Sequence, residues 1–167
     1  YLQQYPQDPP LAYGDLEKLV KHTEGWAAGL TLTALALSKQ EDQRHFIDAF
    51  SGAHIYLREY FMETVLQRSS PRVQEFLLKT AVLKHLNGGL CNALTGQTDG
   101  DQMLQHLWEE NLFIARLEQQ GWYRYHDLFA EMLLSQLQSR YPEEISRLHQ
   151  CAAQWYREQY APADSIY

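Results

Sequence analysis

The sequence predicts a mainly α-helical fold with one β-hairpin. Apolar residues recur at spacings of three and four in nearly every segment, which is the period of a helix with one buried face. The period falls to two only on either side of Gly121, which predicts two short strands joined by a tight turn. Three of the six prolines lie between Tyr5 and Pro10, so we expect a loop there, before the first helix.

The first part of the chain is expected to form a small bundle of three helices. One helix covers about residues 14–22, and Thr23-Glu24 is expected to cap a second helix that ends near Ser38. The small residues at 27–29 keep the first turn of this helix thin, so that a neighbour can approach closely. A third helix is expected over about 41–50. The buried face of the second helix carries Trp26, Leu30, Ala34 and Leu37.

The rest of the chain has the element order of a winged-helix domain. Ser70 is expected to cap a helix in which Pro71 takes the first position, and Asp127 to cap the helix after the hairpin. A last amphipathic helix begins near Pro142. In order, we expect helices from 53 to just before 69 and at about 72–82, 90–94 and 102–110, strands at 112–118 and 122–125, and a helix from 127 to about 137. The predicted units are a helical arm at 1–52, a winged-helix domain at 53–140 and a helical lead-in at 141–167.

Composition limits the classes of function. With 167 residues, 45% hydrophobic and 21% charged, the chain is expected to fold, and its longest apolar stretch is too short to cross a membrane. Its net charge is −7, and residues 99–110, before the hairpin, hold four acids and no Lys or Arg. Because such a surface repels phosphates, we expect no direct binding of nucleic acid. Cys91 and Cys151 are expected to be free thiols in a reducing compartment.

The sequence contains no set of residues that indicates catalysis. It has no metal-binding spacing of His and Cys, no nucleophile motif and no phosphate-binding loop of the form G-x-x-x-x-G-K-[ST]. We therefore expect neither an enzyme nor a metal site in this chain. The chain begins at Tyr1 rather than at Met and stops inside an amphipathic run, so we expect it to be part of a longer protein.

Two places are candidates for binding. His126 follows the second strand and precedes a helix, where an imidazole can donate a hydrogen bond to a phosphate oxygen, although Asp127 opposes an anion there. The alternative is a histidine whose hydrogen bonds are satisfied by local backbone groups. The thin turn at Trp26–Gly29 serves either the close packing of two helices or the approach of a flat ligand.

Five segments of the chain, taken in order, carry a family resemblance. They are Thr23–Leu30 (TEGWAAGL), Phe76–Thr80 (FLLKT), Leu90–Gly96 (LCNALTG), Asn111–Phe113 (NLF) and Trp122–Glu131 (WYRYHDLFAE). These segments resemble the middle region of the large ATP-binding LuxR-type transcriptional regulators, the maltose-regulon-activator-like members of the STAND class of signal-transduction ATPases. A further stretch, Leu148–Tyr156 (LHQCAAQWY), resembles the lead-in to the helical-repeat sensor of these proteins, so that the resemblance covers nearly the whole chain.

The resemblance implies a function for the chain as the arm and winged helix of a switch protein. Gly25, Trp26, Ala27 and Gly29 would lie against the adenine, and His126 would contact the β-phosphate of ADP in the resting form. ADP and ATP would belong to the full-length parent, and neither is expected to bind this fragment tightly alone. The implied partners are the parent's own nucleotide-binding and repeat sensor domains, with self-association in the active state, in the cytoplasm of a bacterium.

The alternative is a protein-interaction module with no role in nucleotide binding. In that hypothesis the hairpin, with Trp122 and Tyr123 exposed, and the acidic helix before it dock a partner protein.

Overall fold

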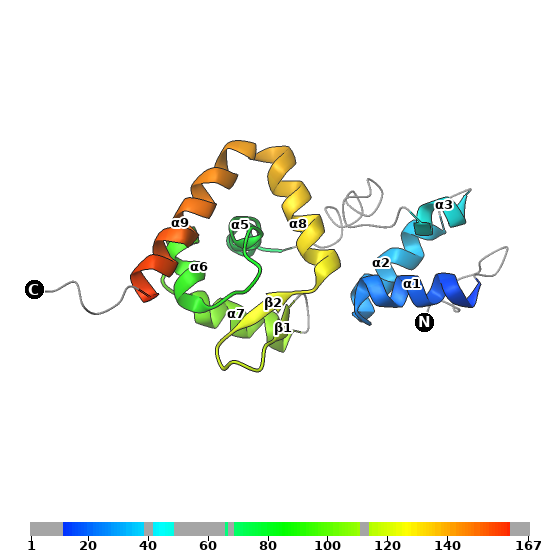
Figure 1. Ribbon diagram of the computed structural model, residues 1–167, viewed down its shortest axis with the longest axis horizontal. Helices are drawn as coiled ribbons and strands as arrows, with labels where there is room; N and C mark the ends of the chain where they lie inside the picture. Colours follow the sequence, from blue (N-terminus) through cyan, green and yellow to red (C-terminus); the bar gives the residue numbers. More distant parts are fainter. Residues whose placement is uncertain (1–11, 39–41, 49–65, 67–68, 111–113, 161–167) are drawn as a thin grey trace, which may run out of the picture.

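The structure is a computed structural model that describes residues 12–38, 42–48, 66, 69–110 and 114–160 (Figure 1). It confirms the predicted fold class, because helices dominate and the described strands form one two-stranded antiparallel sheet. The helices are α1 (Tyr13–Thr23), α2 (Ala27–Leu37), α3 (Gln43–Asp48), α5 (Pro71–Thr80), α6 (Gly88–Thr95), α7 (Gly100–Glu109), α8 (Asp127–Arg140) and α9 (Pro142–Tyr160), and the strands are β1 (Ile114–Arg116) and β2 (Tyr123–Tyr125).

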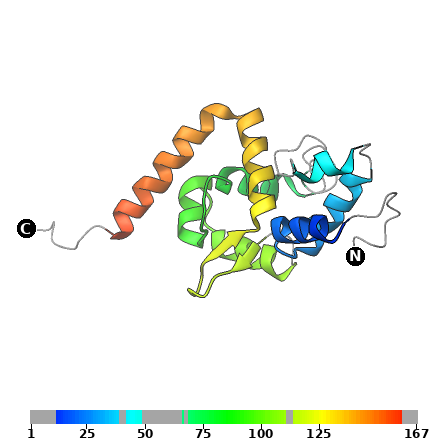
Figure 2. The same cartoon turned by 45° about the vertical axis from the view of Figure 1, so that its right-hand side comes forward.

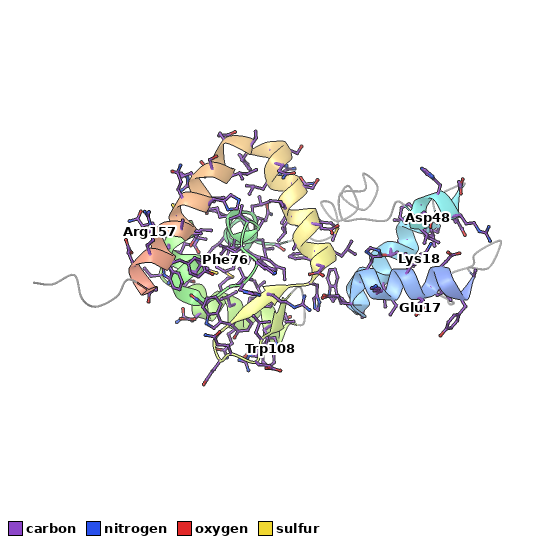
Figure 3. The ribbon with its side chains drawn as sticks, in the orientation of Figure 1. Glu17, Lys18, Asp48, Phe76, Trp108 and Arg157 are labelled. Atoms are coloured by element: carbon purple, nitrogen blue, oxygen red, sulfur yellow. The ribbon has the colours of Figure 1, made fainter. Side chains whose placement is uncertain are left out.

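Helix α5 lies at the centre of the winged-helix part, surrounded by α6, α7, α8 and α9 (Figure 1). Phe76 of α5 is fully buried in the middle of this ring of helices (Figure 3). Helix α5 packs mainly against α6 and α8, while α7 and α9 pack against α6, and the apolar faces of these helices form one core.

The hairpin is held against the helices by side-chain and backbone hydrogen bonds. Ile114 pairs with Tyr125 and Arg116 with Tyr123 in the antiparallel register. The hydroxyl groups of Tyr125 and Thr80 are 2.7 Å apart, which ties β2 to α5, and both side chains are buried. Gly121 has a φ of +78°, as the tight turn requires.

Helices α1, α2 and α3 form the arm, on the side of the winged-helix part opposite to α9 (Figure 2). Lys18 of α1 pairs with Asp48 of α3 at 2.6 Å (Figure 3). Trp26, Ala34 and Leu37 are buried as predicted, while Leu30 is half-buried. Helix α1 also contacts α8, so the arm and the winged-helix part meet directly.

Helix capping is predicted correctly at Ser70 and wrongly at two other places. The Ser70 side chain accepts a hydrogen bond from the Val73 N–H, with Pro71 in the first helical position. Thr23 is not an N-cap but the last residue of α1, where its hydroxyl donates to the Leu19 carbonyl at 2.8 Å. Asp127 is the first residue of α8 rather than its cap, because the extended residue before it is His126.

Helix α6 begins two residues earlier than predicted. Asn87 caps it by accepting a hydrogen bond from the Leu90 N–H at 2.8 Å, so Gly88 and Gly89 lie inside the first turn. Apart from residue 66, the predicted helix from 53 to just before 69 lies outside the described residues, as does the boundary between 52 and 53. Residues 111–113, which include the expected start of the first strand, also lie outside them. The division into three units therefore stays a prediction.

Both cysteines are free, as expected, and burial raises the pKa of the Cys91 thiol to about 12. Within the part of the chain that the structure describes, no helix is both long enough and apolar enough to span a bilayer.

Gly88 and Gly100 allow α6 and α7 to approach each other closely. A Cβ atom at Gly100 would lie 2.5 Å from the Gly88 carbonyl oxygen, which belongs to the backbone and cannot rotate away. We expect Gly100→Ala to lower the free energy of unfolding by about 2–3 kcal/mol, measured by urea denaturation. Gly14→Ala is the control, because nothing lies within 4 Å of its Cβ position, and it should stabilise α1 by about 0.5–1 kcal/mol. Equal stability of the two variants would contradict this packing.

Candidate functional site

The turn between α1 and α2 contains two successive residues in the left-handed conformation. Glu24 has φ 52° and ψ 27°, and Gly25 has φ 70°. Glu24 is the only non-glycine residue with positive φ among those the structure describes. This conformation costs about 1 kcal/mol for a residue with a side chain, and helices more often place Gly or Asn there. The turn brings Trp26 to the N-cap of α2.

The first turn of α2, which carries small residues, leaves room for the indole ring of Trp26. Its side chain is 6% exposed, and a Cβ atom at Gly29 would lie only 2.4 Å from the ring. Gly29 therefore makes room for the N-cap side chain of its own helix, rather than for the second helix of the packing alternative. The ring also makes an edge contact with Phe129 of α8, with centroids 5.9 Å apart.

The imidazole of His126 stacks on this same indole. It follows β2 and stands at the N-cap of α8. The ring centroids of Trp26 and His126 are 5.7 Å apart and their planes differ by 12°. The structure thus brings together two of the predicted site residues that are 100 positions apart in the chain. The stack fixes the plane of the imidazole.

The Glu24 carboxylate joins the two parts by accepting two hydrogen bonds. Its Oε2 accepts from Nη1 of Arg124 at 2.9 Å and pairs with Nδ1 of His126 at 3.1 Å. Arg124 also donates to the Tyr125 carbonyl at 3.2 Å and lies 3.6 Å from the Asp127 carboxylate. We call Glu24, Trp26, Arg124 and His126 the arm–wing clasp.

The charges of the clasp keep Glu24 ionised. Partial burial opposes ionisation, but the hydrogen bonds from Arg124 and His126 outweigh it, so the pKa of Glu24 lies below its ordinary value. The Glu24 side chain is 25% exposed and that of Arg124 is 32% exposed. Because solvent reaches both groups, this interaction is weaker than a fully buried ion pair.

Gly25 and Ala27, the other predicted site residues, are exposed and make no clasp contact. The side chains of Glu24 and Arg124 were not predicted. Both lie in segments that carry the family resemblance, but the sequence favours Glu24 as part of a helix cap, and only its left-handed backbone turns the carboxylate toward His126.

The other candidate surfaces are less suited to binding. Tyr123 is 6% exposed, so the expectation that it is exposed is wrong: it pairs with Leu86 through two backbone hydrogen bonds of 2.8 Å. Trp122 is half-buried and packs edge-on against Trp155 of α9. Asp99, before α7, pairs with Arg72. The described residues contain no group of three potential metal ligands.

The fold and the clasp define a winged-helix protein with a helical arm that packs where β2 leads into α8. Comparison with known proteins specifies the class, because residues 62–145 match the family described as the MalT winged helix domain. The chain belongs to this family.

The curated relatives are much longer proteins. The chain is 36% identical over 149 residues to the serine/threonine-protein kinase PknK of Mycobacterium tuberculosis, an alignment that covers 89% of this chain and 13% of PknK. It is 30% identical over 161 residues to the HTH-type transcriptional regulator MalT of Klebsiella pneumoniae and 32% identical over 163 residues to MalT of Yersinia enterocolitica. Both MalT alignments cover 95% of this chain and 18% of the relative.

The lowered pKa of Glu24 predicts an acid-sensitive contribution to stability. Because the pKa of Glu24 is lower in the folded than in the unfolded state, the contribution is complete above about pH 4.5 and is lost as the pH falls through the folded-state value. We expect Glu24→Gln to lower the free energy of unfolding by about 1 kcal/mol at about pH 7 and to have little effect at about pH 3.

Urea denaturation at both pH values measures this difference. Glu17→Gln is the control, since Glu17 is an exposed carboxylate on the same helix. A Glu24→Gln effect that is the same at both pH values would contradict an ionic role for the clasp.

Proposed function

We propose that this chain is a non-catalytic regulatory region of an ATP-dependent transcriptional regulator, in which it couples the nucleotide state to a change between a closed and an open form. In this proposal the parent protein works in the cytoplasm of a bacterium, holds ADP in the closed form, and self-associates in the open form. Its partners within the same molecule are a nucleotide-binding domain and a repeat sensor domain.

The observation that carries the proposal is the contact of His126 with Trp26 and Glu24. The family resemblance assigns the turn at Trp26 to the adenine and His126 to the β-phosphate. These two assignments come from segments a hundred residues apart, and a nucleotide can bridge them only if they lie together in the fold. The name shared by two of the relatives, HTH-type transcriptional regulator, supports the regulatory role.

The clasp residues fit the phosphate end of a nucleotide. Arg124 is a cation, and Nε2 of His126 has no hydrogen-bonding partner among the described residues. ADP, when bound, supplies a negatively charged phosphate that accepts hydrogen bonds. The sequence has no phosphate-binding loop, so other parts of the parent protein must hold the rest of the nucleotide. His126 would then tie the winged helix to the nucleotide-binding domain.

The size of the effect follows from one charge-assisted hydrogen bond. Such a bond contributes about 1.5–3 kcal/mol, which changes an equilibrium about ten- to a hundredfold. A ligand shifts the balance between closed and open forms only by the difference in its affinity for them. If the bond to His126 exists only in the closed form, ADP favours that form by this factor.

The proposal predicts that His126→Ala in the full-length protein weakens ADP binding about ten- to a hundredfold and raises transcription without inducer. Equilibrium dialysis measures the first effect and a reporter gene the second. His126→Phe should behave in the same way, because it keeps a flat ring against Trp26 but has no nitrogen.

The matched control is His149→Ala, which removes an exposed histidine of α9. If His126→Ala and His126→Phe leave both ADP affinity and basal activity unchanged, the proposed function is wrong.

A further inference from the structure

The sequence places a glutamate where the backbone favours glycine. Glu24 follows the end of α1 in the left-handed conformation, and its N–H bonds to the Lys21 carbonyl at 3.2 Å, as any residue's N–H would. The backbone therefore gives no reason for a carboxylate at this position. Strained residues of this kind are found where the side chain has a task of its own.

The task that the contacts indicate is to hold His126. An ionised carboxylate only accepts hydrogen bonds, so Nδ1 of His126 must carry the proton in its 3.1 Å contact with Glu24. Stacking on Trp26 fixes the plane of the ring, and the bond to Glu24 fixes its rotation within that plane. Nε2, on the far side of the ring, is the nitrogen left for a ligand.

We propose that Glu24 is the positioning residue of His126: it binds Nδ1 and so presents Nε2 to the phosphate of the nucleotide. This inference rests on the proposed function, in which His126 meets that phosphate. The neutral imidazole with its proton on Nδ1 has a lone pair on Nε2, which repels an oxyanion. A phosphate at Nε2 therefore requires the doubly protonated ring, whose positive charge the Glu24 carboxylate offsets.

The other charged groups around the ring do not replace Glu24. Arg124, at the end of β2, is a cation and donates to the same Glu24 carboxylate, so it cannot accept the Nδ1 proton. Asp127, at the start of α8, lies 3.6 Å from Arg124 and is 74% exposed, so solvent screens it. Glu24 is the carboxylate that contacts the imidazole in the described part of the chain.

Two substitutions distinguish the effect of the Glu24 carboxylate from the effect of the left-handed backbone turn. Glu24→Gln removes the charge and keeps the length of the side chain, while Glu24→Gly also removes the side chain but relieves the left-handed backbone. If Glu24 only shaped the turn, the Glu24→Gly variant would bind ADP as tightly as the natural protein. If Glu24 positions His126, both variants bind ADP more weakly than the natural protein. The control Glu17→Gln, on the exposed side of α1, keeps the natural affinity (Figure 3).

The experiment measures the ADP affinity of the full-length protein at about pH 7, with His126→Ala as the reference. We expect both Glu24 variants to weaken ADP binding about tenfold at about pH 7, because each removes the carboxylate that holds Nδ1 of His126. Nitrogen NMR of the 167-residue chain supplies a second readout. The neutral His126 ring should carry its proton on Nδ1 in the natural chain and on Nε2 in Glu24→Gly.

The outcomes distinguish this inference from the proposed function. If His126→Ala weakens ADP binding but either Glu24 variant leaves the affinity unchanged, Glu24 does not position His126 and the proposed function stands. If a Glu24 variant binds ADP more tightly, the carboxylate competes with the phosphate, which also overturns the inference. If His126→Ala has no effect on ADP binding, the proposed function fails first and this inference fails with it.

Discussion

The hydrogen bonds of the Glu24 carboxylate are the interaction on which the arrangement of the two parts depends. They join the end of α1 to the end of β2 at 2.9 and 3.1 Å, across about a hundred residues of sequence. Apolar contact also joins the parts, because Trp26 packs against Phe129 and the buried residues of the arm and of the winged helix form one core. What the carboxylate adds is a fixed orientation between the parts, since a charge-assisted bond has a preferred direction and apolar contact does not.

The indole of Trp26 extends this contact into the core. It lies between Gly29, which leaves room for it, and the rings of His126 and Phe129. An aromatic pair of this kind contributes about 0.5–1.5 kcal/mol beyond the area that it buries. The polar side chains of the clasp are therefore partly exposed to water, whereas the Trp26 ring beside them is buried.

Much of the fold could be predicted from the sequence because the signals are local. Ser70-Pro71 marks a helix start, Gly121 marks a tight turn, and the helical period marks the buried faces. The errors at Thr23 and Asp127 arise because both residue types favour N-caps, yet the neighbouring backbone decides whether the position is extended or helical. Local propensity does not contain that information.

The candidate site was predicted only in part, for a related reason. Trp26 and His126 could be selected from the sequence, but their stacking depends on how α8 packs against the arm. The sequence does not identify Glu24 as the hydrogen-bonding partner of His126, because the carboxylate reaches that ring only from a left-handed backbone. A glutamate followed by glycine at a helix end is the one local signal for it.

The strength of the clasp is suited to a reversible contact. Glu24 is 25% exposed, Arg124 32% and His126 19%, so water weakens their attraction without cancelling it. A contact of about 1–3 kcal/mol can be opened by a ligand whose affinities for two forms differ about ten- to a hundredfold. A fully buried ion pair would resist opening, because separating it leaves an uncompensated charge away from water. In the proposed switch, the partial exposure of the clasp side chains keeps their interaction weak enough for one phosphate group to change the balance between the closed and the open form.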